Sequence, residues 1–209
     1  EIRKHLASHP QDIHKLTKET STASKYPQPP YVGVIHRLDR PVSGIMVYAK
    51  NPKAAASLST SLQQGKIEKW YQAVICGKPV DNNGTYVDYL KQDKKNNCSR
   101  IVDKSDPDGK RAELEYKVLD CIQKDPQYLS LVEIKLLTGR HHQIRVQFSG
   151  HGTPLYGDGK YGNNEKAVRK SLALCACHLK FKHPATGKIM DFQIKPDTGA
   201  FKLFSKSND

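Results

Sequence analysis

The sequence predicts an α+β fold, in which a mixed and mainly antiparallel central sheet is flanked by helices and loops. Its apolar residues cluster in short runs rich in β-branched and aromatic side chains, and turn-forming residues separate these runs. Only residues 51–66 combine a helix-forming composition with suitable residues at both ends. Many strands and few helices favour a sheet with helices packed on it.

We expect one domain over residues 31–209, because the chain shows no internal repeat and no convincing linker. The chain has 209 residues, which is enough to bury a sizeable core. The preceding residues 1–30 are polar and poor in branched apolar side chains, and prolines close this segment. One short helix followed by a loop is expected there.

The first elements of the predicted domain surround the sequence HRLDRPVSG, residues 36–44. Short β-rich runs precede and follow it, at residues 31–35 and 44–50. The helix comes next: Asn51 can cap it, Pro52 suits its first turn and Gly65 suits its end.

The rest of the chain reads as strands joined by turns. Residues 81–111 are the least globular part, and we expect a solvated hairpin or loop there, or an arm that touches a phosphate backbone. A short helix is expected at residues 199–206. The predicted strands are residues 66–77, 112–122, 128–137, 141–148, 172–181 and 189–194.

The composition is strongly basic. The chain has 34 Lys and Arg against 21 Asp and Glu, a formal charge of +13. This excess favours a polyanionic partner, most often nucleic acid. An anionic membrane is the competing interpretation, but the sequence has no long amphipathic helix with a basic face. No apolar run approaches the ~20 residues that a membrane span needs. We predict nucleic acid as the partner, and no membrane.

The cysteines predict a reducing compartment. The chain has five, an odd number, and three of them lie in apolar strand-like runs. Buried free thiols explain this better than disulfides, so the expected location is the cytoplasm. Cys175 to His178, CACH, resembles half of a metal site, but no second half is visible. We expect core cysteines and no metal.

Asp39 is the first candidate for chemistry. It stands between Arg37 and Arg40, at the mouth of two apolar runs. A salt-bridged aspartate in a cleft can stay ionised and act as nucleophile or base. A surface ion pair worth roughly 0–1 kcal/mol is the alternative, and this segment alone leaves both open.

The sequence TGRHHQIRVQF, residues 138–148, is the second candidate. Read as a strand, it places Gln143, Arg145 and Gln147 on one face. Arg145 could then hold a carboxylate in a bidentate pair. His141 and His142 would point to opposite faces of such a strand, which argues against a shared metal ion.

Two further motifs could contact a ligand. Lys69 and Tyr71 share a face of the strand predicted at residues 66–77, where Tyr71 could stack on a base or simply pack in the core. The sequence PLYGDGKYG, residues 154–162, has the glycines of tight turns and could approach a ligand closely. It is neither a dinucleotide fingerprint nor a P-loop.

These motifs, in this order, resemble those of the RluA-type pseudouridine synthases. HRLDRPVSG resembles the family's H-R-L-D-x-x-T-S-G, KWY its K-x-Y, GRHHQIR its G-R-x-H-Q-I-R and PLYGDGKYG its P-x-x-G-D-x-x-Y-G. The resemblance covers roughly residues 31–195 and implies the pseudouridine synthase fold. It also implies isomerisation of uridine to pseudouridine in RNA, without a cofactor or metal.

The resemblance also implies roles for single residues. Asp39 would be the catalytic aspartate, Arg145 its ion-pair partner, and Tyr71 the tyrosine that stacks on the uracil and assists proton removal. Arg37 would wedge into the RNA stack as the target base leaves, and Arg40 would contact phosphate. The other expected RNA contacts are His36, Lys69, Arg140, His142 and Gln143.

The sequence departs from the family pattern at three places. Val42 replaces the usual threonine, Gln147 stands where the family often has histidine, and residues 1–30 lack the strand that usually precedes the first motif. No S4-type RNA-binding domain is recognisable. We predict a stand-alone monomeric enzyme that acts on ribosomal or transfer RNA through its own basic surface.

Overall fold

A computed structural model of the chain describes residues 29–162 and 171–205. The helix and loop expected in residues 1–30 fall outside these residues, apart from Pro29 and Pro30. The described chain divides into two compact units, which are considered separately. Unit 1 holds residues 29–37, 46–66 and 182–189, and unit 2 holds residues 38–45, 67–162, 171–181 and 190–205. The single domain expected over residues 31–209 stays a prediction.

Unit 1 contains the predicted helix and two short strands. Strands β1 (Gly33–Val34) and β3 (Tyr48–Ala49) pair antiparallel, and helix α3 (Pro52–Gln63) follows. The Asn51 side chain accepts a hydrogen bond from the backbone N–H of Ala54 at 2.8 Å, so it caps the helix as predicted. Gly65 follows the helix end with a φ of +68°, a conformation that glycine adopts without steric cost.

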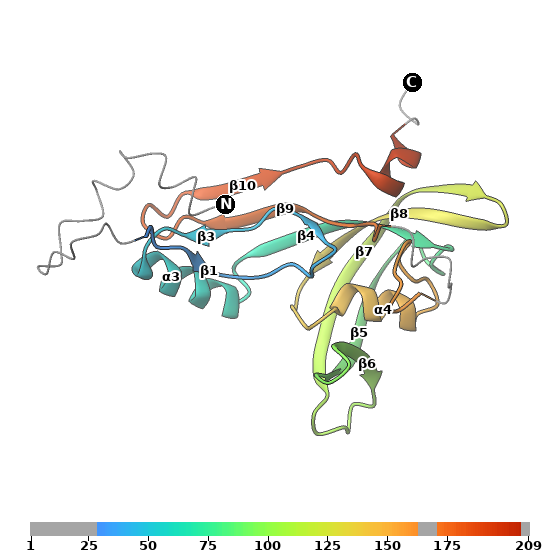
Figure 1. Cartoon of the computed structure of the whole chain (residues 1–209), viewed down its shortest axis with the longest axis horizontal. Coiled ribbons are helices and arrows are strands. Elements are labelled where there is room, and N and C mark those ends of the chain that lie inside the picture. The colour runs from blue at the N-terminus through green and yellow to red at the C-terminus, as the bar shows by residue number, and fades with distance from the viewer. Residues whose placement is uncertain (1–28, 163–170, 206–209) are drawn as a thin grey trace, which may run out of the picture. The chain divides into compact units, whose positions relative to one another are not determined.

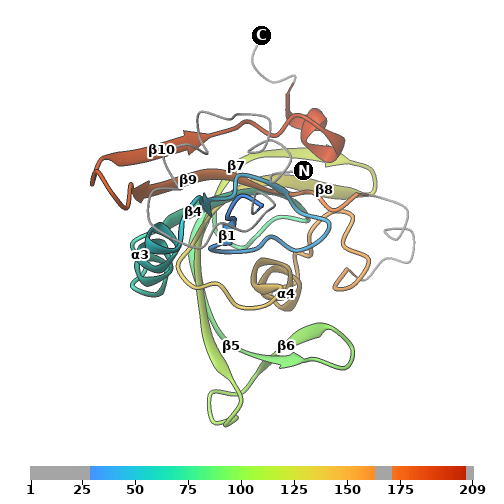
Figure 2. The ribbon, with the colours of Figure 1, turned by 60° about the vertical axis from the view of Figure 1, so that its left-hand side comes forward.

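Unit 2 is built on one large sheet (Figures 1 and 2). The strand order is β10-β9-β4-β8-β7-β5-β6, and β2 pairs with β9 outside this path. The β4–β8, β4–β9, β7–β8, β5–β7 and β5–β6 pairs are antiparallel, whereas β2 pairs parallel with β9. This confirms the α+β class with a mainly antiparallel sheet. The strands are β2 (Ser43–Gly44), β4 (Glu68–Cys76), β5 (Asn83–Asp93), β6 (Cys98–Val102), β7 (Lys110–Lys124), β8 (Gln127–Leu136), β9 (Leu174–Lys182) and β10 (Ile189–Gln193).

The core of unit 2 lies on both faces of this sheet. Helix α4 (Gln143–Gly150) covers one face, where Ile144 and Phe148 pack against β4, β7, β8 and β9. The 3₁₀ helix η2 (Gly199–Phe204) covers the other, where Phe201 packs against Val74 and its neighbours. Figure 2 shows α4 and η2 on opposite sides of the sheet.

The strand predicted at residues 141–148 is wrong, because this segment forms α4. Its alternation of apolar and polar residues suggested a strand, but every residue from His142 to Phe148 is buried. A helix enclosed on all sides has no solvent-facing stripe, so the periodicity that normally distinguishes a helix is absent. Tertiary packing thus overrides the strand preference of Ile144 and Val146.

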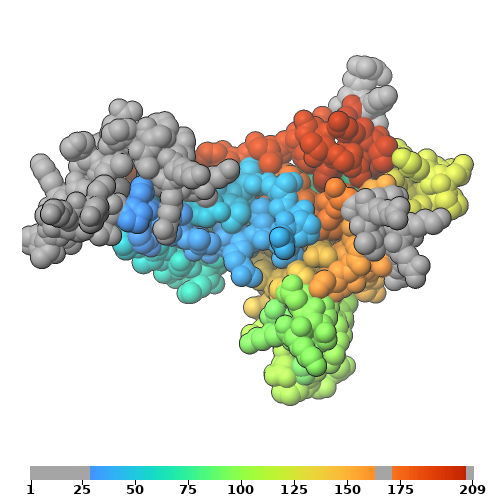
Figure 3. Space-filling model, in the orientation of Figure 1, coloured from blue at the N-terminus to red at the C-terminus, as the bar shows by residue number. Residues whose placement is uncertain are grey.

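Within residues 81–111, β5 and β6 pair antiparallel, which confirms the expected hairpin. Figure 3 shows its outer end as a projection from unit 2, coloured green. The turn between the strands is closed by Asp93, which accepts hydrogen bonds from the backbone and side-chain nitrogens of Asn96. Within the described residues, no helix is long and apolar enough to cross a membrane.

Candidate active site

Asp39 stands at the start of a turn in unit 2. The backbone N–H of Val42 donates to the Asp39 carbonyl at 2.8 Å, which closes the turn over Arg40 and Pro41. The chain then pairs with β9, where Gly44 lies opposite Ala176 and Ile45 N–H donates to the Ala176 carbonyl at 2.9 Å. A Cβ on Gly44 would lie only 2.3 Å from that carbonyl oxygen, and its φ is +131°. Only glycine fits here, so the last residue of HRLDRPVSG anchors Asp39 to the sheet.

Arg145 forms a buried, bidentate ion pair with Asp158. Its Nε and Nη2 donate to the two carboxylate oxygens at 2.8 Å each, and neither side chain is more than 7% exposed. Burial alone would lower the pKa of Arg145, but the hydrogen bonds and charge of Asp158 raise it. Burial would likewise raise the pKa of Asp158, but the hydrogen bonds and charge of Arg145 lower it. Both groups are therefore charged at neutral pH.

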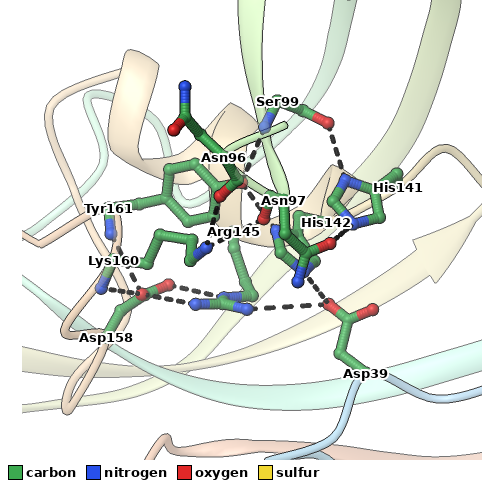
Figure 4. A network of polar contacts seen from close by, with 10 residues as sticks. All are labelled: Asp39, Asn96, Asn97, Ser99, His141, His142, Arg145, Asp158, Lys160 and Tyr161. Atoms are coloured by element: carbon green, nitrogen blue, oxygen red, sulfur yellow. Dashed lines mark hydrogen bonds and ion pairs between the residues drawn. The ribbon is translucent and has the colours of Figure 1, made fainter. Parts of the chain in front are cut away.

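Asp39 lies beyond the free end of the same guanidinium. Nη1 of Arg145 is 3.8 Å from Oδ2 of Asp39, and Nε2 of His142 is 3.7 Å from the same oxygen. Figure 4 shows this line of charges, with Asp158 on one side of Arg145 and Asp39 on the other. The side chain of Asp39 is 28% exposed, so this carboxylate can meet a ligand. The structure thus brings together Arg145 and Asp39, two of the residues that the sequence singled out.

His142 is buried beside this pair. Its Nδ1 lies 2.6 Å from the hydroxyl of Tyr161, and its ring stacks on that of His141 at 3.7 Å. Burial lowers the pKa of His142 to about 4, although the charge of Asp39 acts in the opposite direction. The imidazole is therefore neutral at neutral pH.

Tyr71 lies on β4, on the sheet face that α4 covers. It is 7% exposed. Burial, with a contribution from the charge of Asp39, raises the pKa of Tyr71 to about 12. The side chain is thus a phenol at neutral pH. Lys69 is on the same strand, and burial lowers its pKa.

Asp158 is a residue of this site that sequence reasoning missed. It lies in PLYGDGKYG, between two tight turns, and its Oδ1 also accepts from the backbone N–H groups of Lys160 and Tyr161 at 3.0 and 3.1 Å. A Cβ on Gly157 would lie 2.2 Å from the Ser171 carbonyl oxygen, and one on Gly162 would lie 2.4 Å from that of Asp158. An aspartate followed by such a turn could have been recognised as an anion held by backbone N–H groups.

The residues predicted to contact RNA differ in their exposure to solvent. Arg40 and Arg140 are exposed, and Nε of Arg140 donates to the Arg111 carbonyl at 2.9 Å. Gln143 is only 3% exposed, and its amide bonds to Thr138, to the Arg140 N–H and to the Glu113 carbonyl. It closes the loop before α4 rather than facing solvent. His36 and Arg37 belong to unit 1.

The hairpin β5–β6 also reaches this site. His141 bonds to Ser99 Oγ at 2.9 Å and to Asn97 Oδ1 at 3.1 Å. Nζ of Lys160 donates to the carbonyls of Asn96 and Asn97 at 3.2 and 2.8 Å. Figure 4 shows these contacts on the side of Arg145 away from the loop that carries Asp39. The hairpin therefore forms part of the wall around the buried ion pair.

Comparison with known proteins identifies the family. Residues 3–150 match the family model described as RNA pseudouridylate synthase. The chain belongs to this family. An uncharacterized RNA pseudouridine synthase of Bacillus subtilis (strain 168), YlyB, is 38% identical over 161 residues, which are 77% of this chain and 51% of that protein. The ribosomal large subunit pseudouridine synthase D of Zymomonas mobilis is 36% identical over 171 residues, 78% of this chain and 52% of that one.

These relatives support the RluA-type membership that the motifs predicted. The chain spans about half the length of the curated relatives it matches. Among solved structures, human RNA Pseudouridylate Synthase Domain Containing 1 superposes with a TM-score of 0.70 at 24% identity, over 80% of this chain and 70% of that one. Human RNA Pseudouridylate Synthase Domain Containing 4 superposes with a TM-score of 0.69 at 23% identity, over 85% of this chain and 76% of that one. These two likenesses support the pseudouridine synthase fold.

Proposed function

We propose that this pseudouridylate synthase family member isomerises uridine to pseudouridine within RNA, with Asp39 as the catalytic aspartate. The observation that carries the proposal is the arrangement of Asp39, Arg145 and Asp158. A buried ion pair holds one end of the arginine, and the other end faces a partly exposed carboxylate. Such an arrangement places a carboxylate opposite a fixed positive charge, at a site that a flipped base can reach.

The chemistry of the reaction suits a fixed carboxylate. When the bond between uracil and ribose breaks, positive charge develops on the sugar and negative charge on the base. Asp39 can stabilise the sugar electrostatically or attack it, or it can attack the base or take a proton. The uracil then turns and rejoins the sugar through C5, and the hydrogen on C5 leaves as a proton.

Tyr71 is proposed to stack on the uracil. Its phenol keeps its proton at neutral pH, since burial raises its pKa to about 12. A neutral aromatic ring is suited to stacking and is a poor base in this state. This favours the stacking role over the proton-removal role that the family resemblance also implied.

RNA binding is proposed to rest on the basic surface, in keeping with the net charge of +13. Arg37 would fill the gap left by the flipped base, and the exposed Arg40 and Arg140 would contact phosphates, with Lys69 and His36 near the target nucleotide. Affinity should then fall steeply with salt, because phosphate contacts release bound counterions. For the target we propose ribosomal or transfer RNA, and the names of two relatives favour large-subunit ribosomal RNA. A cytoplasmic monomer fits this proposal.

The test is tritium release from an RNA transcript that carries [5-³H]uridine, combined with pseudouridine-specific chemical probing. Large-subunit ribosomal RNA and total transfer RNA are the two substrates to compare. The wild-type chain should release tritium from one of them, and Asp39→Asn should reduce the rate at least about 10³-fold. Arg145→Ala should reduce turnover more than RNA binding. Near wild-type turnover by Asp39→Asn would contradict the assigned role.

An RNA-binding protein without chemistry is the competing outcome. It would bind these transcripts with the same salt dependence but release no tritium and leave no pseudouridine. Wild-type protein that gives this result with both RNA classes would overturn the proposed activity.

A further inference from the structure

We propose that His142 is a positioning residue that holds the Asp39 carboxylate through its Nε2–H, and that Tyr161 and the Ser99 backbone set the tautomer that makes this possible. The inference rests on the proposed function, because it assigns Asp39 as the reacting group. It gives a role in the chemistry to a histidine that the sequence suggested as an RNA contact.

The tautomer follows from the hydrogen bonds of Tyr161. The backbone N–H of Ser99 lies 2.9 Å from the Tyr161 hydroxyl oxygen and can only donate to it. The remaining contact of that hydroxyl is Nδ1 of His142, at 2.6 Å. The Tyr161 O–H therefore donates to Nδ1, because the opposite direction would leave its proton without an acceptor among the described residues. Burial raises the pKa of Tyr161 to about 12, so this proton is present at neutral pH.

A neutral imidazole that accepts at Nδ1 carries its hydrogen on Nε2. That hydrogen faces Oδ2 of Asp39, with Nε2 at 3.7 Å. Nη1 of Arg145 approaches the same oxygen at 3.8 Å. Within residues 29–162 and 171–205, Oδ1 of Asp39 has no hydrogen-bond partner. Two donors thus come closest to the same oxygen, and no direct hydrogen bond from the described residues occupies either oxygen, so the carboxylate is available to the substrate.

Both distances are longer than direct hydrogen bonds, which leaves room for the carboxylate to move. Hydrogen bonds of this kind commonly tighten when substrate binds. His142 itself has little freedom: it packs on His141, it is 8% exposed, and its backbone is left-handed with a φ of 55°. The moving partner is then Asp39, and His142 is the fixed point.

A neutral donor suits this place because the charges around it are already balanced. The groups that bear on His142 are Asp39, Arg145, His141 and Lys160. Asp158 compensates Arg145, so the negative charge of Asp39 is available for the sugar. A protonated His142 would partly cancel that charge, whereas the neutral Nε2–H orients the carboxylate and leaves it ionised.

The first test uses two amides as substitutes for the imidazole. The amide nitrogen of glutamine reaches the place of Nε2, whereas that of asparagine reaches only the place of Nδ1. Asparagine tolerates the left-handed backbone better than glutamine, so His142→Asn should fold at least as well. His142→Gln should retain turnover within about threefold of wild type, and His142→Asn should lose tenfold or more, the scale of one hydrogen bond to a charged group. Equal losses would overturn the proposal.

Tyr161→Phe tests the origin of the tautomer. It removes the hydroxyl and keeps the ring, whose face lies 5.0 Å from the Arg145 guanidinium. We expect kcat for tritium release to fall about tenfold with KM little changed, because geometry around Asp39 and not RNA binding is altered. Tyr128→Phe, at an exposed position on β8, is the matched control and should behave as wild type. A rise in KM at constant kcat would contradict the positioning role.

A second measurement is independent of activity. In ¹⁵N-labelled protein, the side-chain nitrogen shifts of His142 should show hydrogen on Nε2 and none on Nδ1 at pH 7. In Tyr161→Phe the two tautomers should mix and the pKa of His142 should rise, because a hydrogen bond to the neutral form is lost. Hydrogen on Nδ1 in the wild type would overturn the proposal. Failure of the proposed function, seen as an inactive wild type, leaves this result unaffected.

Discussion

The two ends of Arg145 meet their carboxylates in contrasting ways. On one side, Asp158 is fully buried and accepts two hydrogen bonds of 2.8 Å, together with two from backbone N–H groups. On the other side, Asp39 is 28% exposed and lies 3.8 Å away. The first carboxylate is fully satisfied and keeps the arginine in place. The second is oriented only loosely and is accessible to a ligand, so a buried structural carboxylate and a partly exposed one share one cation.

Removing the structural carboxylate should have the largest effect on stability. Asp158→Asn leaves the buried Arg145 charge without its anion, which typically costs about 3–5 kcal/mol. Asp39→Asn should change the free energy of unfolding by less than about 1 kcal/mol, because that contact is long and partly exposed. Urea denaturation of both variants measures the difference. Equal destabilisation by both variants would show that Asp158 and Asp39 contribute equally to stability, which would contradict the proposed difference between them.

The second largest effect is expected at Gly44, which anchors the Asp39 segment to β9. Gly44→Ala places a Cβ 2.3 Å from the Ala176 carbonyl oxygen at a φ of +131°, so the strand pairing of β2 must open. We expect the free energy of unfolding to fall by about 2–4 kcal/mol and most of the turnover to be lost. Gly65→Ala is the matched control: its φ is +68° and no atom lies within 4 Å of the added carbon. That variant should lose only about 1 kcal/mol and keep its activity.

The buried histidine beside Asp39 predicts a pH dependence of stability. Burial lowers the folded-state pKa of His142 to about 4 from an ordinary value near 6.5. Below that ordinary value the unfolded chain binds a proton at His142, whereas the folded chain does not. The free energy of unfolding therefore falls as the pH drops from about 6.5 to about 4. The loss from this group should be about 2–3 kcal/mol. In His142→Gln the urea midpoint should change less with pH between about 6.5 and about 4. If the midpoint changes with pH as much as in the wild type, a buried neutral histidine is contradicted.

Asp158 acts in a lower pH range, so its contribution to the pH dependence of stability can be distinguished from that of His142. The pKa of Asp158 is lowered in the folded state by its pairing with Arg145, against the effect of burial. Its stabilisation is therefore complete above the unfolded value near 3.9 and is lost only as the pH falls below it.

The smallest effect is expected at an exposed ion pair. Nζ of Lys135 lies 3.6 Å from Glu68, and both side chains are more than a third exposed. Glu68→Gln should change the free energy of unfolding by less than about 0.5 kcal/mol, because solvent and salt screen the pair. Denaturation at low and high salt checks this. A loss comparable to that of Asp158→Asn would break the distinction between buried and exposed pairs.

The sequence predicted Asp39 and its neighbour Arg145, but it did not predict the helix that carries Arg145 or the second carboxylate, Asp158. The motifs and the family resemblance named Asp39 and Arg145 as partners; the structure places them 3.8 Å apart, and the roles assigned to them stay predictions. The strand assigned to residues 141–148 is wrong, since burial on all sides removed the periodic signal of a helix. The role of Asp158 was missed because its partner lies on α4, and no local pattern states which arginine a turn aspartate will meet.

The sequence by itself therefore determined the family, the class of sheet and the capped helix at α3, and it named Asp39 as the candidate reactive carboxylate. These depend on short-range signals: turn residues, helix caps and motif spacing. Only the tertiary structure decided that Arg145 faces two aspartates, that His142 is buried and neutral, and that the hairpin β5–β6 closes around them. The physical reason is that desolvation and hydrogen-bond geometry depend on which distant segments meet, and this is fixed only when the sheet and α4 pack together.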